Sequence, residues 1–281
     1  TLHGCSHFLE HLLFKGTDSL RKGDIDLVTL RNGGANNADT TTDRTRYYFS
    51  FAADRWERAL EIEADRMRGS AFDEFEFQAE RGPVLEELRR DHDDPWWRLH
   101  ETLEATAYQV HPYRNPVIGW AEEVIRVPRT DVLAFYDAWY RPNNCVLVVA
   151  GAINVERAAA RITELFGPLK ATPLPKTFVP VKPRQESERR FELELEVSVP
   201  RMVAAFHTVP VSHADDVVLD VLNVVLSSGK ASRLYDRLVR RDRLVTDVQV
   251  ANDTRRDPGL FSVYLEVQDG VAPARAEAAL W

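Results

Sequence analysis

A proline-rich stretch near the middle of the chain limits how its 281 residues can fold. Prolines stand at positions 168, 173, 175, 180 and 183, and residues 168–188 carry almost no periodic apolar pattern. Proline lacks a backbone donor and fixes φ, which disfavours a helix or a central strand throughout this stretch. An extended linker is the expected structure. We therefore predict a first domain at residues 1–168, a linker at 169–189 and a second domain at 190–281.

Helical and strand patterns alternate on both sides of this linker. Helices are expected where apolar residues recur every three or four positions, and strands where β-branched and aromatic residues gather. In the first domain we expect helices over 4–15, 56–67, 73–90, 130–140 and 155–166, and strands over 45–51 and 145–150. In the second we expect strands over 191–197, 246–251 and 260–267, and helices over 217–226, 232–240 and 273–280. This mixture predicts an α+β fold.

Three local signals refine these elements. Asp54 and Glu57 have the spacing of a capping box, which would begin the helix that follows. Asn154 should cap the helix over 155–166. The pair Gly82-Pro83 lies inside the pattern over 73–90 and should kink that helix or restart it.

The composition narrows the class of function. With 44% hydrophobic residues the chain can bury a sizeable core. Its formal net charge of −8 argues against nucleic-acid binding as a main activity, because the sequence has no basic stripe to neutralise phosphates. Its two cysteines, Cys5 and Cys145, are too few for a disulfide framework, and Cys145 is expected in the core. No apolar run approaches the roughly 20 residues of a membrane span. Because the sequence begins at Thr1, a leader segment stays open, as does the compartment: bacterial periplasm, cytoplasm or an organelle.

The segment His7-Phe8-Leu9-Glu10-His11 carries the clearest chemical signal. On a helix, residues four apart project from one face, so the imidazoles of His7 and His11 can reach a single ion. Glu10 lies beside them and can act as general base toward water activated by zinc. Three polar residues on an exposed helix face would be the simpler explanation of a histidine pair alone. The full pattern, however, should occur by chance only about once in a hundred such chains.

A catalytic zinc needs a third protein ligand and one open position. An acidic helix over 73–90 offers three candidates, and composition does not choose among them: Glu80, Glu86 and Glu87.

The motif and its surroundings resemble the pitrilysin and insulinase family of zinc peptidases, specifically the branch of the mitochondrial processing peptidase. In that family a ligand Glu follows the second motif His by about 76 residues, within a Glu-Arg-x-x-x-x-x-Glu segment. Here the segment extends from Glu80 to Glu87. The resemblance implies one zinc per chain, with Glu87 as third ligand and Glu80 supporting the site from behind the ligands. Pro83 departs from the family's usual apolar residue.

The resemblance also implies a substrate strand and a fold. Residues 33–40 match the family's Gly-Gly-x-x-Asn-Ala-x-Thr, which begins an edge strand that pairs with extended peptide. Asn37, Ala38, Asp39 and Thr40 would then bind substrate. The family's domains are two related α/β sandwiches, each a mixed sheet packed with helices, and we expect both ends of this chain to be incomplete. Apart from the resemblance, Asp91, Asp93, Asp94 and Glu101 follow the ligand helix and could favour basic residues, although an acidic run is more often a solvated face.

One pair of family residues is missing. Family enzymes hold substrate and stabilise the oxyanion with an Arg and a Tyr seven residues apart in the second domain. Those positions fall on Val239 and Thr246. Nearby Arg240, Arg241 and Arg243 could substitute, although a solvated basic helix end explains them more simply. In the processing-peptidase branch, zinc and Arg/Tyr can reside on different subunits, so a homologous partner is expected, in a heterodimer or a homodimer.

The sequence thus predicts a zinc-dependent endopeptidase subunit acting on peptides or unfolded segments. His7, His11 and Glu87 would bind zinc, and Glu10 would be the general base. The alternatives are a noncatalytic structural subunit of an assembly and a zinc store or sensor.

Overall fold

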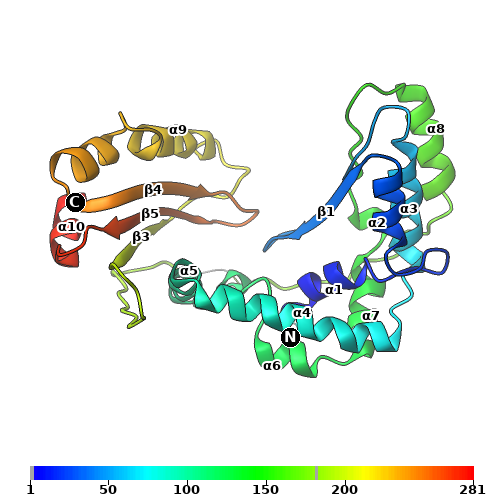
Figure 1. The fold of residues 1–281 in the computed structure, drawn as a ribbon, viewed down its shortest axis with the longest axis horizontal. Coiled ribbons are helices and arrows are strands. Elements are labelled where there is room, and N and C mark those ends of the chain that lie inside the picture. Colours follow the sequence, from blue (N-terminus) through cyan, green and yellow to red (C-terminus); the bar gives the residue numbers. More distant parts are fainter. Residues whose placement is uncertain (1–2, 181–182) are drawn as a thin grey trace. The chain divides into compact units, whose positions relative to one another are not determined.

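The chain was analysed as a computed structural model that describes residues 3–180 and 183–281. Helices pack against small antiparallel sheets, and the predicted α+β class is confirmed. The chain divides into two compact units, each considered by itself below (Figure 1). The first contains residues up to 90 together with 115–180, and the second contains 91–114 and residues from 183 onward. In the described part of the chain, no helix combines the length and the apolar character that crossing a membrane requires.

The predicted domain bounds of 1–168 and 190–281 remain a prediction. The linker predicted at 169–189 forms neither helix nor strand where it is described, and its residues 181–182 lie outside the described part. The division into compact units differs from the predicted bounds in one respect, because the second unit also takes in residues 91–114.

A β-hairpin and a set of helices form the first unit. Its elements are α1 (Cys5–Leu12), α2 (Asp24–Arg31), β1 (Ala35–Thr40), β2 (Thr45–Ser50), α3 (Glu57–Gly69), α4 (Glu74–Asp93), α6 (Ala121–Arg126), α7 (Arg129–Trp139), the 3₁₀ turn η2 (Pro142–Asn144) and α8 (Val155–Phe166). Residues 91–93 of α4 belong to the second unit. Asn154 caps α8 as predicted, since its side chain accepts a hydrogen bond from the Arg157 N–H at 2.8 Å.

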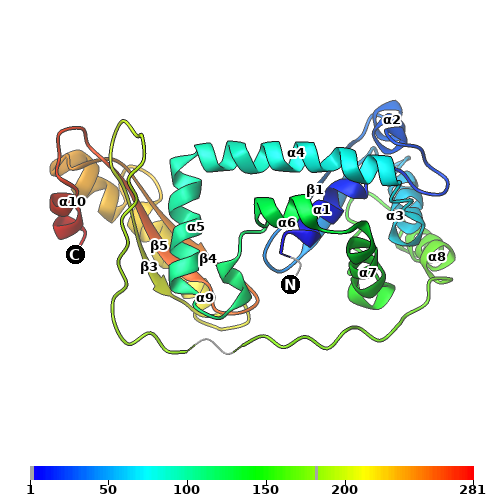
Figure 2. The same ribbon diagram turned by 90° about the horizontal axis from the view of Figure 1, so that it is seen from below.

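Helix α1 is held on its apolar side by the core of the first unit. Phe8, Leu9 and Leu12 are at most 2% exposed. Helix α4 lies alongside α1, where the rings of Phe8 and Phe77 are 5.3 Å apart (Figure 2). Gly4, just before α1, has φ 75°, and a Cβ there would lie 2.4 Å from the backbone oxygen of Ile118. Only glycine therefore fits the start of this helix.

Helix α4 continues without a break through Pro83. Its buried residues are Phe77, Glu80, Val84 and Leu88, spaced three or four apart along one face. The predicted restart at Gly82-Pro83 is therefore wrong, because packing of this face keeps the helix intact across the proline. The stripe also contains Glu80, a carboxylate in an otherwise apolar row.

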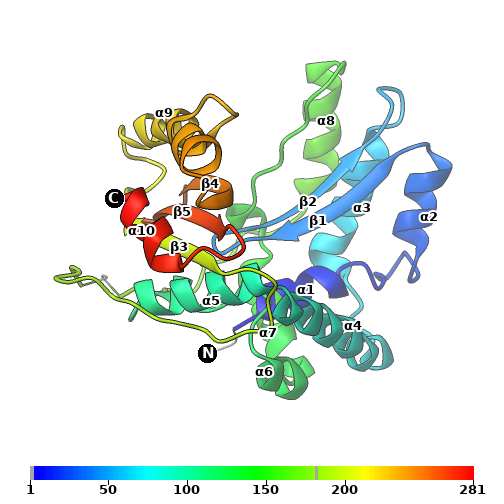
Figure 3. The same cartoon turned by 60° about the vertical axis from the view of Figure 1, so that its left-hand side comes forward.

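The hairpin β1–β2 pairs Ala35 with Ser50 at one end and Thr40 with Thr45 at the other. Side chains alternate between the two faces of such a pair. In β2, Thr45, Tyr47 and Phe49 are half-buried, whereas the intervening residues are exposed. Figure 3 shows this hairpin beside α3. Arg66 of α3 packs against the inward face, with its guanidinium 4.2 Å from the centre of the Tyr47 ring.

The second unit is built on a three-stranded antiparallel sheet of order β3-β5-β4. Its elements are α5 (Pro95–Ala107), the 3₁₀ turn η1 (Pro112–Arg114), β3 (Arg201–His207), α9 (Asp216–Ser227), the π-helix η3 (Tyr235–Arg241), β4 (Val245–Asp253), β5 (Leu260–Val267) and α10 (Pro273–Leu280). Helix α9 packs on β4 (Figure 1). Alternate residues of β4 and most of β5 form the core with Leu238 and Ala276.

Several sequence predictions are wrong. Residues 145–150 and 191–197 are not strands, because no neighbouring strand completes a ladder with them among the described residues. Val146 and Val148 are consequently 88% and 78% exposed, and Cys145 is exposed rather than in the core. The Asp54–Glu57 capping box does not form, since α3 begins without a side-chain cap. The described ladders are all antiparallel, so the expected mixed sheets are not seen there.

Candidate metal centre

Helix α1 presents its two histidines on the side opposite its buried leucines and phenylalanine. The rings of His7 and His11 have centroids 4.8 Å apart, as expected for residues one helical turn apart. Their side chains are 12% and 23% exposed. Burial, reinforced by the neighbouring His11, lowers the pKa of His7 to about 4. Since an imidazole must be neutral to bind metal, His7 is in its ligating form at neutral pH.

Glu87 of α4 faces both imidazoles. Its carboxylate oxygens lie 3.7 Å from His7 Nε2 and 3.4 Å from His11 Nε2. Both distances exceed the usual 2.9–3.0 Å of an N–H···O hydrogen bond. One ligand atom from each of the three residues lies within 4.8 Å of the others, so the group could hold a metal ion. Two imidazole nitrogens and one carboxylate match the donor set of a catalytic zinc site that keeps a position open.

Glu80 lies behind His11 rather than among these converging atoms. Its Oε1 is 3.0 Å from His11 Nδ1, and its Oε2 is 2.6 Å from Lys15 Nζ. Although burial opposes ionisation, hydrogen bonds with His11 and Lys15 hold the pKa of Glu80 below its ordinary value. An ionised Glu80 accepts the proton of Nδ1, which leaves Nε2 of His11 free for metal.

The remaining acidic candidate lies outside this group. The Glu86 side chain is 74% exposed and pairs with Arg89 at 3.1 Å. It is rotated about 100° around the helix from Glu87, which turns it toward solvent. Of the three glutamates that composition left open, one faces the histidines, one supports His11, and one takes no part.

Glu10 is 9% exposed and lies between the histidine face of α1 and strand β1. Thr40 Oγ1 donates a short hydrogen bond to Glu10 Oε2. Burial raises the pKa of Glu10, and the hydrogen bond from Thr40 opposes this rise. A carboxylate with a raised pKa beside a candidate metal centre is well suited to accept and return a proton.

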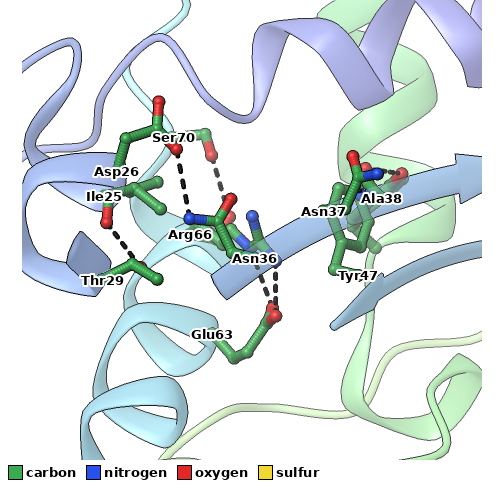
Figure 4. A network of polar contacts seen from close by, with 11 residues as sticks. Ile25, Asp26, Thr29, Asn36, Asn37, Ala38, Tyr47, Glu63, Arg66 and Ser70 are labelled. Carbon is green, nitrogen blue, oxygen red and sulfur yellow. Dashed lines mark hydrogen bonds and ion pairs between the residues drawn. The ribbon is translucent and has the colours of Figure 1, made fainter. Parts of the chain in front are cut away.

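The predicted substrate residues lie on β1, whose edge away from β2 is unpaired among the described residues. The Ala38 N–H donates to Asn37 Oδ1 at 2.9 Å instead of to a strand (Figure 4). Asp39 forms an ion pair with Arg46 across the hairpin at 2.8 Å. Thr40 lies on the opposite, inward face and contacts Glu10. The four residues therefore do not share one side-chain surface, and alternate residues, Ala38 and Thr40, direct their backbone groups to the open edge.

The positions of the family's Arg and Tyr lie in the second unit and carry no comparable chemistry. Val239 packs against the core of that unit. Thr246 Oγ1 donates to the Glu266 side chain at 3.0 Å. Two of the nearby arginines, Arg240 and Arg241, are engaged on their own helix, since both pair with Asp236. This arrangement agrees with a solvated helix end.

Two functional contacts escaped the sequence analysis. Lys15 follows His11 by four residues, a spacing that could have placed both on one face of a longer helix and so suggested a shared partner. The hydroxyl of Thr40 had no such signal, because its contact with Glu10 depends on how the hairpin packs against α1. Cys5 is buried, which raises the pKa of its thiol to about 12, and it is not among the converging ligand atoms.

Replacing Glu80 with Gln should weaken zinc binding about tenfold to a hundredfold, because a neutral amide orients His11 less strongly than a carboxylate. Competition with a fluorescent zinc chelator would measure the affinity. Glu86→Gln is the matched control, since it removes one charge from the same helix at an exposed position. Equal affinities for the two variants would contradict the role of Glu80.

Both the family models and the curated relatives that the chain matches are described as peptidases or proteases. Residues 1–120 match the family model described as insulinase (peptidase family M16), and residues 126–280 match the model described as the peptidase M16 inactive domain. The chain is 32% identical over 281 residues to the zinc protease PqqE of Helicobacter pylori, covering 98% of this chain and 62% of that protein. It is 27% identical to an Arabidopsis thaliana protein named as a probable mitochondrial-processing peptidase subunit beta, covering 93% and 51%.

Solved structures agree with these matches. The crystal structure of a protease from Helicobacter pylori superimposes with a TM-score of 0.94 at 28% identity, covering 99% of this chain and 68% of that one. An M16-like peptidase from Alicyclobacillus acidocaldarius, at 22% identity, shares the fold with a TM-score of 0.85, covering 100% and 67%. The chain spans about 51–63% of the length of the first curated relatives that it matches.

Proposed function

The chain belongs to the insulinase family of peptidases, family M16, and from that premise we propose that it is a zinc-dependent endopeptidase subunit. His7, His11 and Glu87 would bind the zinc ion, with Glu80 orienting His11, and Glu10 would be the general base. The observation that carries this proposal is the convergence of the three ligand side chains within 4.8 Å beside a buried carboxylate that is not one of them.

The chemistry follows from the protonation states of these side chains. Zinc bound there supplies a Lewis acid that brings the pKa of a coordinated water to about 7. Glu10, ionised and free of the ligand set, takes a proton from the attacking water and returns it to the leaving amine. Neutral His7 and the Glu80-oriented His11 would each offer a nitrogen lone pair to the ion. In this proposal one carboxylate, Glu87, binds the metal, and a different carboxylate, Glu10, acts as the base.

The open edge of β1 suggests how a peptide would be held. An extended main chain could add to β1 by replacing the Asn37 side chain at the Ala38 N–H. Of the four proposed substrate residues, Ala38 and Thr40 would contribute backbone groups at this edge, and Asn37 and Asp39 would line it with their side chains. Recognition of this kind tolerates many side chains, and it requires a segment without its own secondary structure. The proposed substrates are therefore peptides and unfolded segments.

A homologous partner subunit is part of the proposal. Val239 and Thr246 stand where family enzymes carry Arg and Tyr, so this chain has no group at those positions to hold substrate or stabilise an oxyanion. A second, homologous chain with both residues would complete the site in a heterodimer, whereas a homodimer would pair two copies that carry Val239 and Thr246. The Arabidopsis relative is named as a subunit, which is consistent with paired chains.

A noncatalytic structural subunit is the second candidate. The same two substitutions favour it, as does the description of the second matched model as an inactive domain. Intact His7, Glu10, His11 and Glu87 favour the peptidase, because a scaffold has no need of a base beside a metal site.

Changing Glu10 to Gln decides between these candidates. For a peptidase, peptide turnover should fall by about two orders of magnitude or more, because the amide cannot accept the proton. Zinc content should stay at one ion per chain. Turnover would be followed with a quenched fluorescent peptide and zinc by atomic emission, with Glu86→Gln as the exposed control. Unchanged turnover would reject the catalytic role.

Adding a homologous chain that carries the Arg and Tyr should raise turnover well above that of this chain alone. The increase would come from substrate and oxyanion contacts that Val239 and Thr246 cannot make. Titration of the partner at fixed concentration of this chain would give a saturating curve. If the purified chain with zinc cleaves peptides as fast as every reconstituted mixture, the proposed division between subunits is wrong.

A further inference from the structure

We propose that Thr40 is a positioning residue for Glu10, held in its donating orientation by the hydroxyl group of Thr45 on the paired strand. The inference rests on the proposed function, since it concerns the general base, and it assigns to the Thr40 side chain a role separate from backbone recognition of substrate. It begins from the short contact in which Thr40 Oγ1 donates to Glu10 Oε2.

The contact fixes which carboxylate oxygen is engaged. An ionised carboxylate only accepts hydrogen bonds, so the hydroxyl of Thr40 must be the donor. Its single proton is then committed to Oε2 of Glu10. The other oxygen, Oε1, is left to accept a proton during the reaction. Thr40 also limits rotation of the carboxyl group, because β1 and α1 are separate elements that clamp it from two sides.

The next hydroxyl along the hairpin supports this orientation. Thr40 and Thr45 are paired across the strands, and their Oγ1 atoms are 3.1 Å apart. Since the proton of Thr40 points to Glu10, Thr45 must donate to Thr40. The hydroxyl row from Thr45 to Thr40 to Glu10 thus has one direction of donation.

Two phenols lie near this row. The hydroxyl oxygens of Tyr47 and Tyr140 are 2.9 Å apart. Burial raises the pKa of Tyr140 to about 12 and that of Tyr47 well above its ordinary value. Both phenols therefore keep their protons at working pH.

Buried packing holds the Tyr47 ring. Arg66 is 2% exposed and places its guanidinium 4.2 Å from the centre of the Tyr47 ring. Glu63 pairs with that guanidinium, and its Oε2 accepts from Arg66 Nε at 2.8 Å (Figure 4).

The direction of donation in the row has a consequence for the chemistry, because Oε2 of Glu10 already accepts the proton of Thr40. The hydroxyl of Thr40 keeps donating to Oε2 before and after Glu10 accepts a proton. The proton from water accordingly binds Oε1, and the row itself carries no proton. Thr40 contributes by holding the base in place.

The test compares Thr40→Val with Thr40→Ser, because valine has nearly the shape of threonine and serine keeps its hydroxyl. In zinc-loaded protein, assayed with the partner chain if one is needed, Thr40→Val should lower kcat about tenfold to a hundredfold. KM and zinc affinity should change less than about twofold. Thr40→Ser should retain most of the turnover, and Thr45→Val should show a smaller loss because Thr40 still donates. Thr41→Val is the matched control, since among the described residues the Thr41 hydroxyl contacts only the turn between the strands.

The outcomes separate this inference from the proposed function. No hydrolysis by the wild-type protein, alone or with a partner, would reject the proposed function and the positioning role with it. Hydrolysis by wild type and Thr40→Val at the same kcat would reject the inference alone. A loss of zinc affinity or of Tm in Thr40→Val that Thr45→Val shares would mean that the row only stabilises the fold. A loss of kcat confined to the valine variants, with folding and zinc affinity kept, supports the inference.

Discussion

The packing of helix α1 against helix α4 is the contact on which the candidate centre depends. Phe8 and Phe77 meet in the core, and the turn beyond them brings His11 to Glu80 at 3.0 Å. The same alignment of α1 and α4 places Glu87 opposite the Nε2 atoms of both histidines, two helical turns after Glu80. A shift of one residue along either helix would turn the carboxylates away by about 100°. Apolar burial thus sets the geometry of a polar site.

Much of this centre could be predicted from the sequence, because its main parts follow local periodicity. The histidines lie four apart on a helix, and α4 repeats its buried residues every three or four positions. The choice of Glu87 among three glutamates needed the family resemblance, since helical spacing alone does not say which face packs on α1. Pro83 suggested an interruption, yet side chains packed on both sides of it keep the helix whole.

The features that the sequence analysis predicted wrongly or missed depend on contacts between residues distant in sequence. Residues 145–150 have strand composition, but a strand exists only where another backbone pairs with it. The contact between Thr40 and Glu10 likewise arises from two elements thirty residues apart, so no local pattern marks it. Tyr47 and Tyr140 are ninety-three positions apart and meet through their hydroxyl groups. The base, the ligands and the hydroxyl row are therefore a tertiary arrangement assembled on predictable local elements.

The central claim is that His7, His11 and Glu87 form one zinc site. Zinc-edge X-ray absorption of the metal-loaded chain tests it most directly, because the method reports the atoms bound to the ion. The account predicts one zinc per chain with two imidazole nitrogens and only oxygen besides, at about 2.0–2.2 Å. Glu87→Gln should lower the affinity while both imidazole signals remain. A zinc–sulfur distance of about 2.3 Å, or a spectrum without paired imidazoles, would contradict the account.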